Sequence, residues 1–165
     1  MDNSLKIEII KRFDTFFSGI NNKGAFLLAF NTFLIGAFLM GYNDFICSIK
    51  CDFKLAFNLM IGLLMLCSIV SMILTIVSMI PYLDSKETNG RKSNWFFNDI
   101  ATEDKQAFFD RINSTSNTDN TNDLNNQIYE LSKGLKKKHC FVKVALIFNL
   151  IQIILLIPII TLILI

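Results

Sequence analysis

Few side chains in this chain of 165 residues are of the types that carry out chemistry, and they stand apart from one another. The only histidine, His139, follows three lysines, and the four cysteines occupy positions 47, 51, 67 and 140. A metal ion needs three or four converging ligands, and covalent catalysis needs a nucleophile beside a base. Neither pattern is present, nor is a glycine-rich phosphate loop. The sequence therefore predicts a protein that is not an enzyme and holds no metal or cofactor.

The cysteine spacing allows one further reaction. Cys47 and Cys51 lie four residues apart, which is close enough within a helical turn for a disulfide in an oxidising compartment. A structural pair usually closes a longer loop, so the spacing alone leaves the redox state open.

Recognition of an anion and of a flat ring is chemistry that the sequence does allow. Arginine and lysine bind phosphate, and tryptophan or tyrosine stacks on a base. Surface charge and core packing are the commoner explanation for the same residue types, and a lysine run beside an apolar stretch usually serves as a topology and headgroup signal. The candidate ligand-binding residues are Arg91, Lys92, Trp95, Tyr129, Lys136, Lys137 and Lys138.

A second set of polar side chains lies inside apolar stretches. Such groups form hydrogen bonds between helices, within one protomer or across an interface, or they line a pore. The apolar stretches contain no Asp, Glu, Lys, Arg or His, which argues against ion-coupled transport. The candidates for helix packing or a pore are Asn31, Asn58, Ser68, Ser71, Thr75, Ser78, Asn149 and Gln152.

The elements that position these groups are set by three uncharged stretches, residues 24–42, 55–80 and 144–165. About 20 apolar residues in a helix cross the hydrocarbon core of a bilayer, and each stretch is near or above that length. A hydrophobic content of 52% and a mean hydropathy of +0.45 agree with a membrane protein. We therefore expect three transmembrane helices and an all-α fold.

The basic residues predict the orientation. Ten of the sixteen Lys and Arg lie in residues 81–143, whereas the loop at 43–54 has only Lys50 and Lys54. By the positive-inside rule, residues 1–23 and 81–143 are cytoplasmic, and the 43–54 loop and the C-terminus lie outside, in the periplasm if the membrane is a bacterial inner membrane. A net charge of +2 is too small to indicate nucleic-acid binding.

The polar segments also have internal order. Residues 1–23 have apolar residues at helical spacing and predict an amphipathic helix, whose basic Lys6, Lys11 and Arg12 suit anionic headgroups. This helix lies on the membrane surface or docks on the soluble segment, and the polar residues 21–24 end it.

The segment 81–143 is expected to be small and helical. After a polar connector at 85–93, Thr102 is a candidate cap for a helix at 103–112, and the polar run 113–122 predicts a loop. From Leu124 onward an apolar stripe predicts a helix continuous with the third span. About 60 soluble residues bury little apolar surface alone, so we expect the N-terminal helix, the membrane surface or a second protomer to complete the burial of Trp95, Phe96 and Phe97. A homo-oligomer is therefore a physical expectation.

Three strings of residues resemble a known family. They are residues 21–28 (Asn-Asn-Lys-Gly-Ala-Phe-Leu-Leu), 95–101 (Trp-Phe-Phe-Asn-Asp-Ile-Ala) and the helix 124–144 around Gln127-Ile128-Tyr129-Glu130-Leu131-Ser132. Together they resemble the transmembrane effector family of Pycsar, the bacterial pyrimidine-cyclase antiphage system. The chain departs from the family pattern at Asn22, where Asp is expected, and at Gly24, where Ala is common.

The resemblance implies an inner-membrane effector that responds to a cyclic pyrimidine nucleotide, cyclic CMP or cyclic UMP, made by a partner cyclase. Activation would impair the membrane and cause abortive infection. The alternative is a small accessory or structural membrane protein that binds a partner through its cytoplasmic segment.

Overall fold

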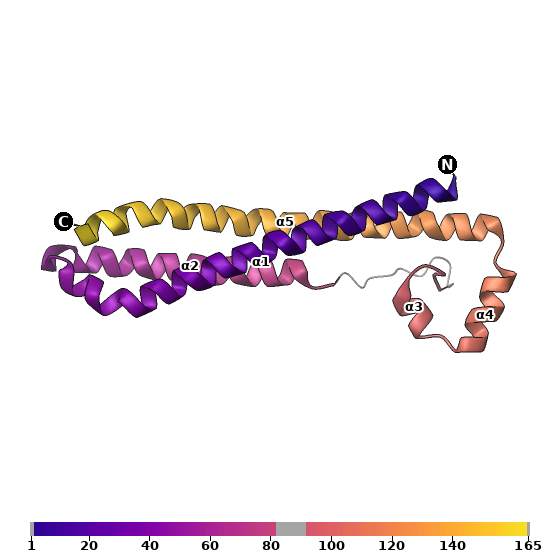
Figure 1. Cartoon of the computed structure of the whole chain (residues 1–165), viewed down its shortest axis with the longest axis horizontal. Coiled ribbons are helices and arrows are strands. Elements are labelled where there is room, and N and C mark those ends of the chain that lie inside the picture. The colour runs from indigo at the N-terminus through magenta and orange to yellow at the C-terminus, as the bar shows by residue number, and fades with distance from the viewer. Residues whose placement is uncertain (1, 82–91, 165) are drawn as a thin grey trace. The chain divides into compact units, whose positions relative to one another are not determined.

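The computed structural model describes residues 2–81 and 92–164, and every regular element in these ranges is helical (Figure 1). The helices are α1 (Asn3–Ser48), the 3-10 turn η1 (Cys51–Phe53), α2 (Lys54–Met79), α3 (Phe97–Ala101), α4 (Lys105–Ser114) and α5 (Asn117–Leu164). Three segments are long and apolar enough to cross a membrane: α1, the stretch Cys51–Met79 that contains α2, and α5. The predicted all-α membrane fold is therefore confirmed, and the last soluble helix continues into the third span as expected.

The chain forms two compact units, which we describe separately. The polar unit comprises residues 1–19 and 81–137, and the apolar unit comprises residues 20–80 and 138–165. Both α1 and α5 contribute residues to each unit.

The apolar unit is a bundle of three helical segments with its own core. Leu34 and Phe38 of α1, Phe57 and Leu64 of α2 and Ile159 of α5 are all buried in one cluster. Within a bilayer such a core is stabilised by van der Waals packing, because lipid tails are as apolar as these side chains.

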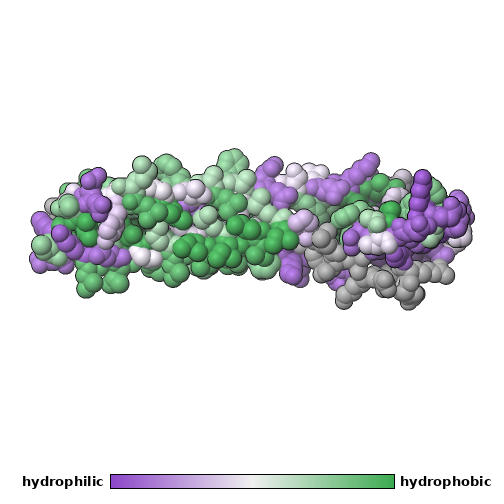
Figure 2. All heavy atoms as spheres, turned by 90° about the horizontal axis from the view of Figure 1, so that it is seen from below, coloured by the Kyte–Doolittle hydropathy of each residue, from purple (hydrophilic) through white to green (hydrophobic). Residues whose placement is uncertain are grey.

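The outside of the apolar unit is also apolar. Phe26, Phe33, Leu59 and Ile157 are each at least 65% exposed. Figure 2 shows hydrophobic side chains over much of the visible face of α1, α2 and α5 in this unit, with hydrophilic ones at the end that holds the α1–α2 connection. Continuous exposed apolar surface of this kind requires a lipid environment. The protein is therefore a membrane protein.

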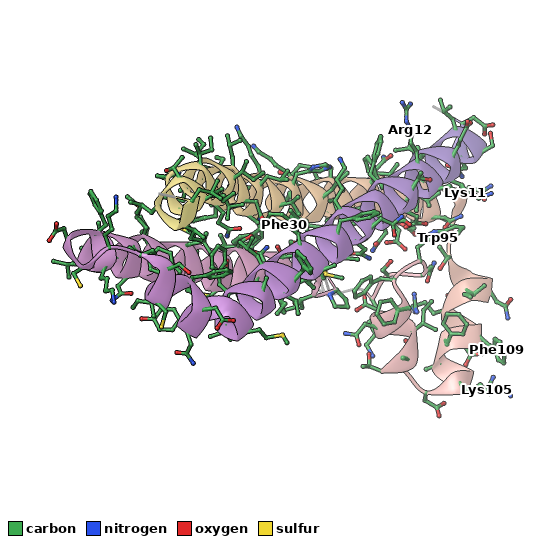
Figure 3. The ribbon with its side chains drawn as sticks, turned by 60° about the vertical axis from the view of Figure 1, so that its left-hand side comes forward. Lys11, Arg12, Phe30, Trp95, Lys105 and Phe109 are labelled. Atoms are coloured by element: carbon green, nitrogen blue, oxygen red, sulfur yellow. The ribbon has the colours of Figure 1, made fainter. Side chains whose placement is uncertain are left out.

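In the polar unit the first turns of α1 dock on the first turns of α5. Lys6 is only 2% exposed, and its Nζ donates a hydrogen bond to the carbonyl of Thr121 at 3.3 Å. The Thr121 hydroxyl donates in turn to Asn3 Oδ1 at 3.2 Å. Lys6 is thus buried against protein and does not face headgroups as the sequence suggested, whereas Lys11 and Arg12 are exposed (Figure 3).

The predicted end of the first helix at residues 21–24 is wrong, because α1 continues through it to Ser48. A glycine inside a helix costs only about 1 kcal/mol relative to alanine, and tertiary packing offsets that easily. Gly24 is buried against α2, where an added Cβ would lie 3.0 Å from Met79 Sδ and 3.3 Å from Thr75 Cγ2. Glycine at this position therefore lets α1 approach α2 closely.

Two boundaries in the soluble segment also differ from expectation. Helix α4 begins at Lys105 and is capped by Asp104, whose side chain accepts a hydrogen bond from Gln106 N at 3.0 Å, so Thr102 is not the cap. The predicted loop at 113–122 is almost wholly helical, because the Ser116 hydroxyl accepts a hydrogen bond from Asp119 N at 3.1 Å and α5 starts at Asn117. A serine at the N-cap converts a polar run into a helix start.

On the other side of the bundle, the predicted 43–54 loop is largely helical as well, since α1 reaches Ser48 and η1 spans Cys51–Phe53. Cys47 and Cys51 are free thiols, and both are exposed. Most of the predicted 85–93 connector lies outside the described residues.

Candidate functional site

Polar side chains from all three helices meet inside the apolar unit. Asn31 of α1, Ser71 of α2 and Asn149 and Gln152 of α5 are each 5% exposed or less, and we call them the buried amide cluster. Asn31 Nδ2 donates hydrogen bonds to Leu27 O at 2.7 Å and to Asn149 Oδ1 at 3.1 Å. Gln152 Nε2 donates to Asn31 Oδ1 at 3.0 Å. These bonds join α1 directly to α5.

Ser71 adds α2 to the cluster. Asn149 Nδ2 donates to Ser71 Oγ and also to Ala145 O at 2.9 Å, while the Ser71 hydroxyl donates to the same carbonyl at 3.2 Å. Ala145 is fully buried and small, which lets α2 approach the α5 backbone closely. The cluster lies between five and nine residues from one end of each uncharged stretch, residues 24, 80 and 144, or roughly 10 Å at 1.5 Å per residue.

One acceptor in the cluster has no hydrogen-bond partner within residues 2–81 and 92–164. This atom is Gln152 Oε1, and the residue is 0% exposed. A buried acceptor left without a donor costs about 1–3 kcal/mol. The observed arrangement of the cluster is therefore not the one that satisfies all of its polar groups.

Three of the other predicted polar residues of α2 form hydrogen bonds within that helix. The hydroxyls of Ser68, Thr75 and Ser78 donate to carbonyls three or four residues earlier in the same helix, at 3.0, 2.8 and 2.7 Å. All three side chains are 0% exposed. Asn58 differs, because it is exposed and its Oδ1 accepts a hydrogen bond from Tyr42 OH at 3.0 Å.

The three predicted lysines of α5 are in different environments. Lys138 is 8% exposed, and its Nζ donates to the carbonyl of Ser78 at 2.8 Å, in the last turn of α2. A cation at a helix C-terminus is favourable because the last carbonyls lack helical donors. Lys136 and Lys137 are exposed. Only these two are therefore available to a ligand without breaking that contact.

In the polar unit, the aromatic string at 95–101 is tied to α5. The Ser93 hydroxyl oxygen accepts hydrogen bonds from Trp95 N at 3.1 Å and Phe96 N at 3.2 Å, and from Gln127 Nε2 at 3.0 Å. Asp99, which is 9% exposed, accepts from Ser93 N at 2.9 Å. Two of the three strings that suggested the family thus meet through Ser93.

Arg111 is a central residue of the polar unit that the sequence did not reveal. Its guanidinium pairs with the Glu103 carboxylate through Nη2 at 2.7 Å and Nε at 3.0 Å. Nη1 donates to Lys92 O at 3.1 Å and to Asn94 Oδ1, and the group lies 5.5 Å from the centre of the Phe108 ring. The eight-residue spacing of Glu103 and Arg111 crosses the start of α4, so no helical periodicity pointed to the pair.

The remaining candidate ligand contacts already have protein partners. Lys92 Nζ donates to Thr102 O at 3.1 Å. Trp95 is 44% exposed, and its indole N–H donates to Asn120 Oδ1 at 2.8 Å. Arg91 lies outside the described residues.

Tyr129 has a separate set of neighbours. It is 60% exposed, and the ammonium of Lys133 lies 4.1 Å from the centre of its ring. A hydrogen bond to the Glu130 carboxylate raises the pKa of Lys133. Trp95 and Tyr129 therefore have different partners rather than facing each other across one described site.

The architecture defines a class: a membrane-spanning bundle of three helices with a small polar unit built from the same chain. Within that class, the model of the Pycsar effector protein domain, PycTM, matches residues 7–165. The chain belongs to this family of membrane effectors in antiphage defence, whose members act with a partner cyclase. No curated protein matches the chain, and no solved structure does.

Proposed function

We propose that the protein is an inner-membrane effector activated by a cyclic pyrimidine nucleotide, cyclic CMP or cyclic UMP, from its partner cyclase. Activation impairs the membrane and causes abortive infection. The family supports the defence role, and the buried amide cluster is the observation that supports membrane damage as the mechanism. The protein acts without catalysis, cofactor or nucleic acid.

The buried cluster suits an effector that must be harmless until it is activated. Asn31, Asn149 and Gln152 face into the bundle, so the surface toward lipid stays apolar. An activated state in which protomers assemble and these amides line a water-filled path would give Gln152 Oε1 the donors that it lacks. Three spans are too few to enclose a wide pore, so this state requires a homo-oligomer.

The polar unit is the proposed receiver of the nucleotide. Lys92, Trp95, Tyr129, Lys136 and Lys137 remain its candidate contacts, with Arg91 beside them in sequence. Helix α5 supplies residues 117–137 to the polar unit and continues without interruption into the apolar unit, so a displacement of its first part has a covalent route to Asn149. A nucleotide drives this change only through different affinities for the resting and activated states.

The proposed topology follows the basic residues. Residues 1–23 and 81–143 lie in the cytoplasm, where the cyclase releases its product, and the C-terminus lies in the periplasm. A reporter fused to either end, active only in the cytoplasm or only in the periplasm, tests this orientation. Cytoplasmic activity at the C-terminus would contradict it.

The cellular experiment is co-expression of the chain with its cyclase, followed by phage infection and uptake of a dye that intact inner membranes exclude. We expect uptake before phage mature, and none when the cyclase is inactivated by mutation. Cells that resist phage while the membrane stays intact would reject membrane damage.

A second candidate is an accessory membrane protein that binds a partner through its aromatic segment. It is favoured by Trp95 and Phe97, which stay 44% and 62% exposed. Forced overexpression together with the nucleotide separates the two: an effector depolarises the cell, and an accessory protein leaves growth unchanged.

A further inference from the structure

A groove of about 380 Å³ lies on the apolar unit between α1 and α5. Its lining has two kinds of side chain. Three are basic, Lys23, His139 and Lys143, which we call the basic end, and the rest of the lining is aliphatic. Among residues 2–81 and 92–164, no acidic, amide or aromatic side chain lines it apart from the imidazole of His139.

The basic end lies where the chain meets the membrane. Lys23 directly precedes the first uncharged stretch and Lys143 directly precedes the third. Both are exposed, and within the described residues neither pairs with a carboxylate. His139 lies one helical turn before Lys143, on the same face of α5. The ammonium groups of Lys23 and Lys143 thus stand next to uncharged stretches with no carboxylate partner among the described residues.

The aliphatic part extends from this end into the bilayer. Leu146, Ile147 and Leu150 come three to seven residues after Lys143, which is about 5–10 Å deeper at 1.5 Å per residue. Their exposed fractions are 48%, 47% and 58%, while the other two aliphatic residues of the lining, Ile20 and Val142, are buried. The groove therefore offers a cationic end followed by an apolar wall.

We propose that this groove is a binding site for an anionic phospholipid. The phosphodiester lies between Lys23 and Lys143, and the first part of an acyl chain lies on Leu146, Ile147 and Leu150. A free cyclic nucleotide is also a phosphodiester anion, but among the described residues the imidazole of His139 is the one ring in the lining, and no side-chain amide is there to read a base. The inference is independent of the proposed function, because it rests only on the groove.

The test uses the full-length chain in a neutral detergent with two lipids of equal chain length, phosphatidylglycerol and phosphatidylcholine. Native mass spectrometry measures how much of each lipid stays bound. We expect phosphatidylglycerol to bind about tenfold more tightly or better, since each lysine near a headgroup contributes to the attraction. Equal binding of the two lipids would overturn the proposal.

Two matched variants locate the site. K23Q/K143Q removes both groove lysines and is expected to abolish the preference, whereas K136Q/K137Q removes the same charge from exposed positions of α5 outside the groove and is expected to keep it. If both variants lose the preference for phosphatidylglycerol equally, the attraction comes from the general positive charge of the protein and not from the groove, and the proposal is overturned.

A third variant keeps every charge, so the proposal remains testable even if K23Q/K143Q does not fold. Leu150→Trp fills the apolar wall and is expected to lower phosphatidylglycerol binding several-fold while the helix content stays the same. Unchanged binding in this variant would contradict a lipid in the groove. In competition, inorganic phosphate or cyclic UMP at millimolar concentration is expected to leave the lipid bound, and displacement by cyclic UMP would reassign the groove to the nucleotide.

Discussion

At the scale of single residues, the apolar unit is held together by polar groups more than its composition suggests. Each of the three helices contributes a hydrogen-bonding side chain to the buried amide cluster, and Lys138 closes the last turn of α2. In hydrocarbon such bonds have no competing water, so they fix which helix faces meet. Gln152 Oε1 is the one acceptor of the cluster with no partner among the described residues.

The cluster predicts a non-additive pair of mutations. Asn31→Leu leaves the whole Gln152 amide without a partner, and we expect it to lower the unfolding free energy in detergent by about 1–3 kcal/mol. Adding Gln152→Leu removes the stranded amide and is expected to recover at least half of that loss. Asn58→Leu is the control, because Asn58 is exposed. Additive losses in the double mutant would contradict the described hydrogen bond.

Lys138 gives a second expectation at this scale. Lys138→Met removes a charge-assisted hydrogen bond to a buried carbonyl and should lower the melting temperature, with a cost of about 1.5–3 kcal/mol. Lys137→Met, at the exposed neighbour, should change stability by less than about 0.5 kcal/mol. Equal effects of the two substitutions would show that the contact with Ser78 does not stabilise the bundle.

At the scale of elements, long periodic segments were predictable and their ends were not. The three spans and the continuity of α5 follow from uncharged length and apolar spacing alone. The helix through residues 21–24 was missed because Gly24 reads locally as a breaker, while its role is close packing against Met79 and Thr75. The helical start at Asn117 was missed because one cap, Ser116, outweighs a polar composition.

Some residues of the candidate site were predictable from the sequence, and others were not. Asn31, Ser71, Asn149 and Gln152 stood out because polar groups are rare in apolar stretches, although the sequence could not say that they meet each other. Arg111 and Ser93 were not predictable, because arginine and serine are common on protein surfaces. Only the tertiary fold brings Glu103 to Arg111 and Gln127 to Ser93.

The Gln127 contact yields an expectation for the polar unit. Gln127→Leu removes the donor to Ser93 Oγ, so the segment that carries the Trp95 and Phe96 amides should open more readily. Hydrogen exchange at these two amides is expected to speed up several-fold, for a loss of about 1 kcal/mol. Gln106→Leu, on the exposed face of α4, is the control and should leave both rates unchanged. Unaltered exchange in the first variant would argue against the docking.

At the scale of the whole molecule, α1 and α5 each contribute residues to the polar unit, which is the proposed receiver of the nucleotide, and to the apolar unit, which is the membrane bundle. The central claim is that a cyclic pyrimidine nucleotide makes this chain damage a membrane. This claim rests on three features. The polar groups of the bundle are buried, Gln152 Oε1 lacks a donor that another arrangement would supply, and α5 is continuous between the two units.

The most direct test is dye release from liposomes that contain only the purified chain, after addition of cyclic UMP or cyclic CMP. The account predicts release with at least one of the two nucleotides and none with cyclic AMP. It also predicts little release from Cys140→Pro, which interrupts α5, and normal release from Cys140→Ala, because Cys140 is exposed and is not a candidate contact. Liposomes that stay sealed with both pyrimidine nucleotides, while the chain is inserted and folded, would contradict the claim.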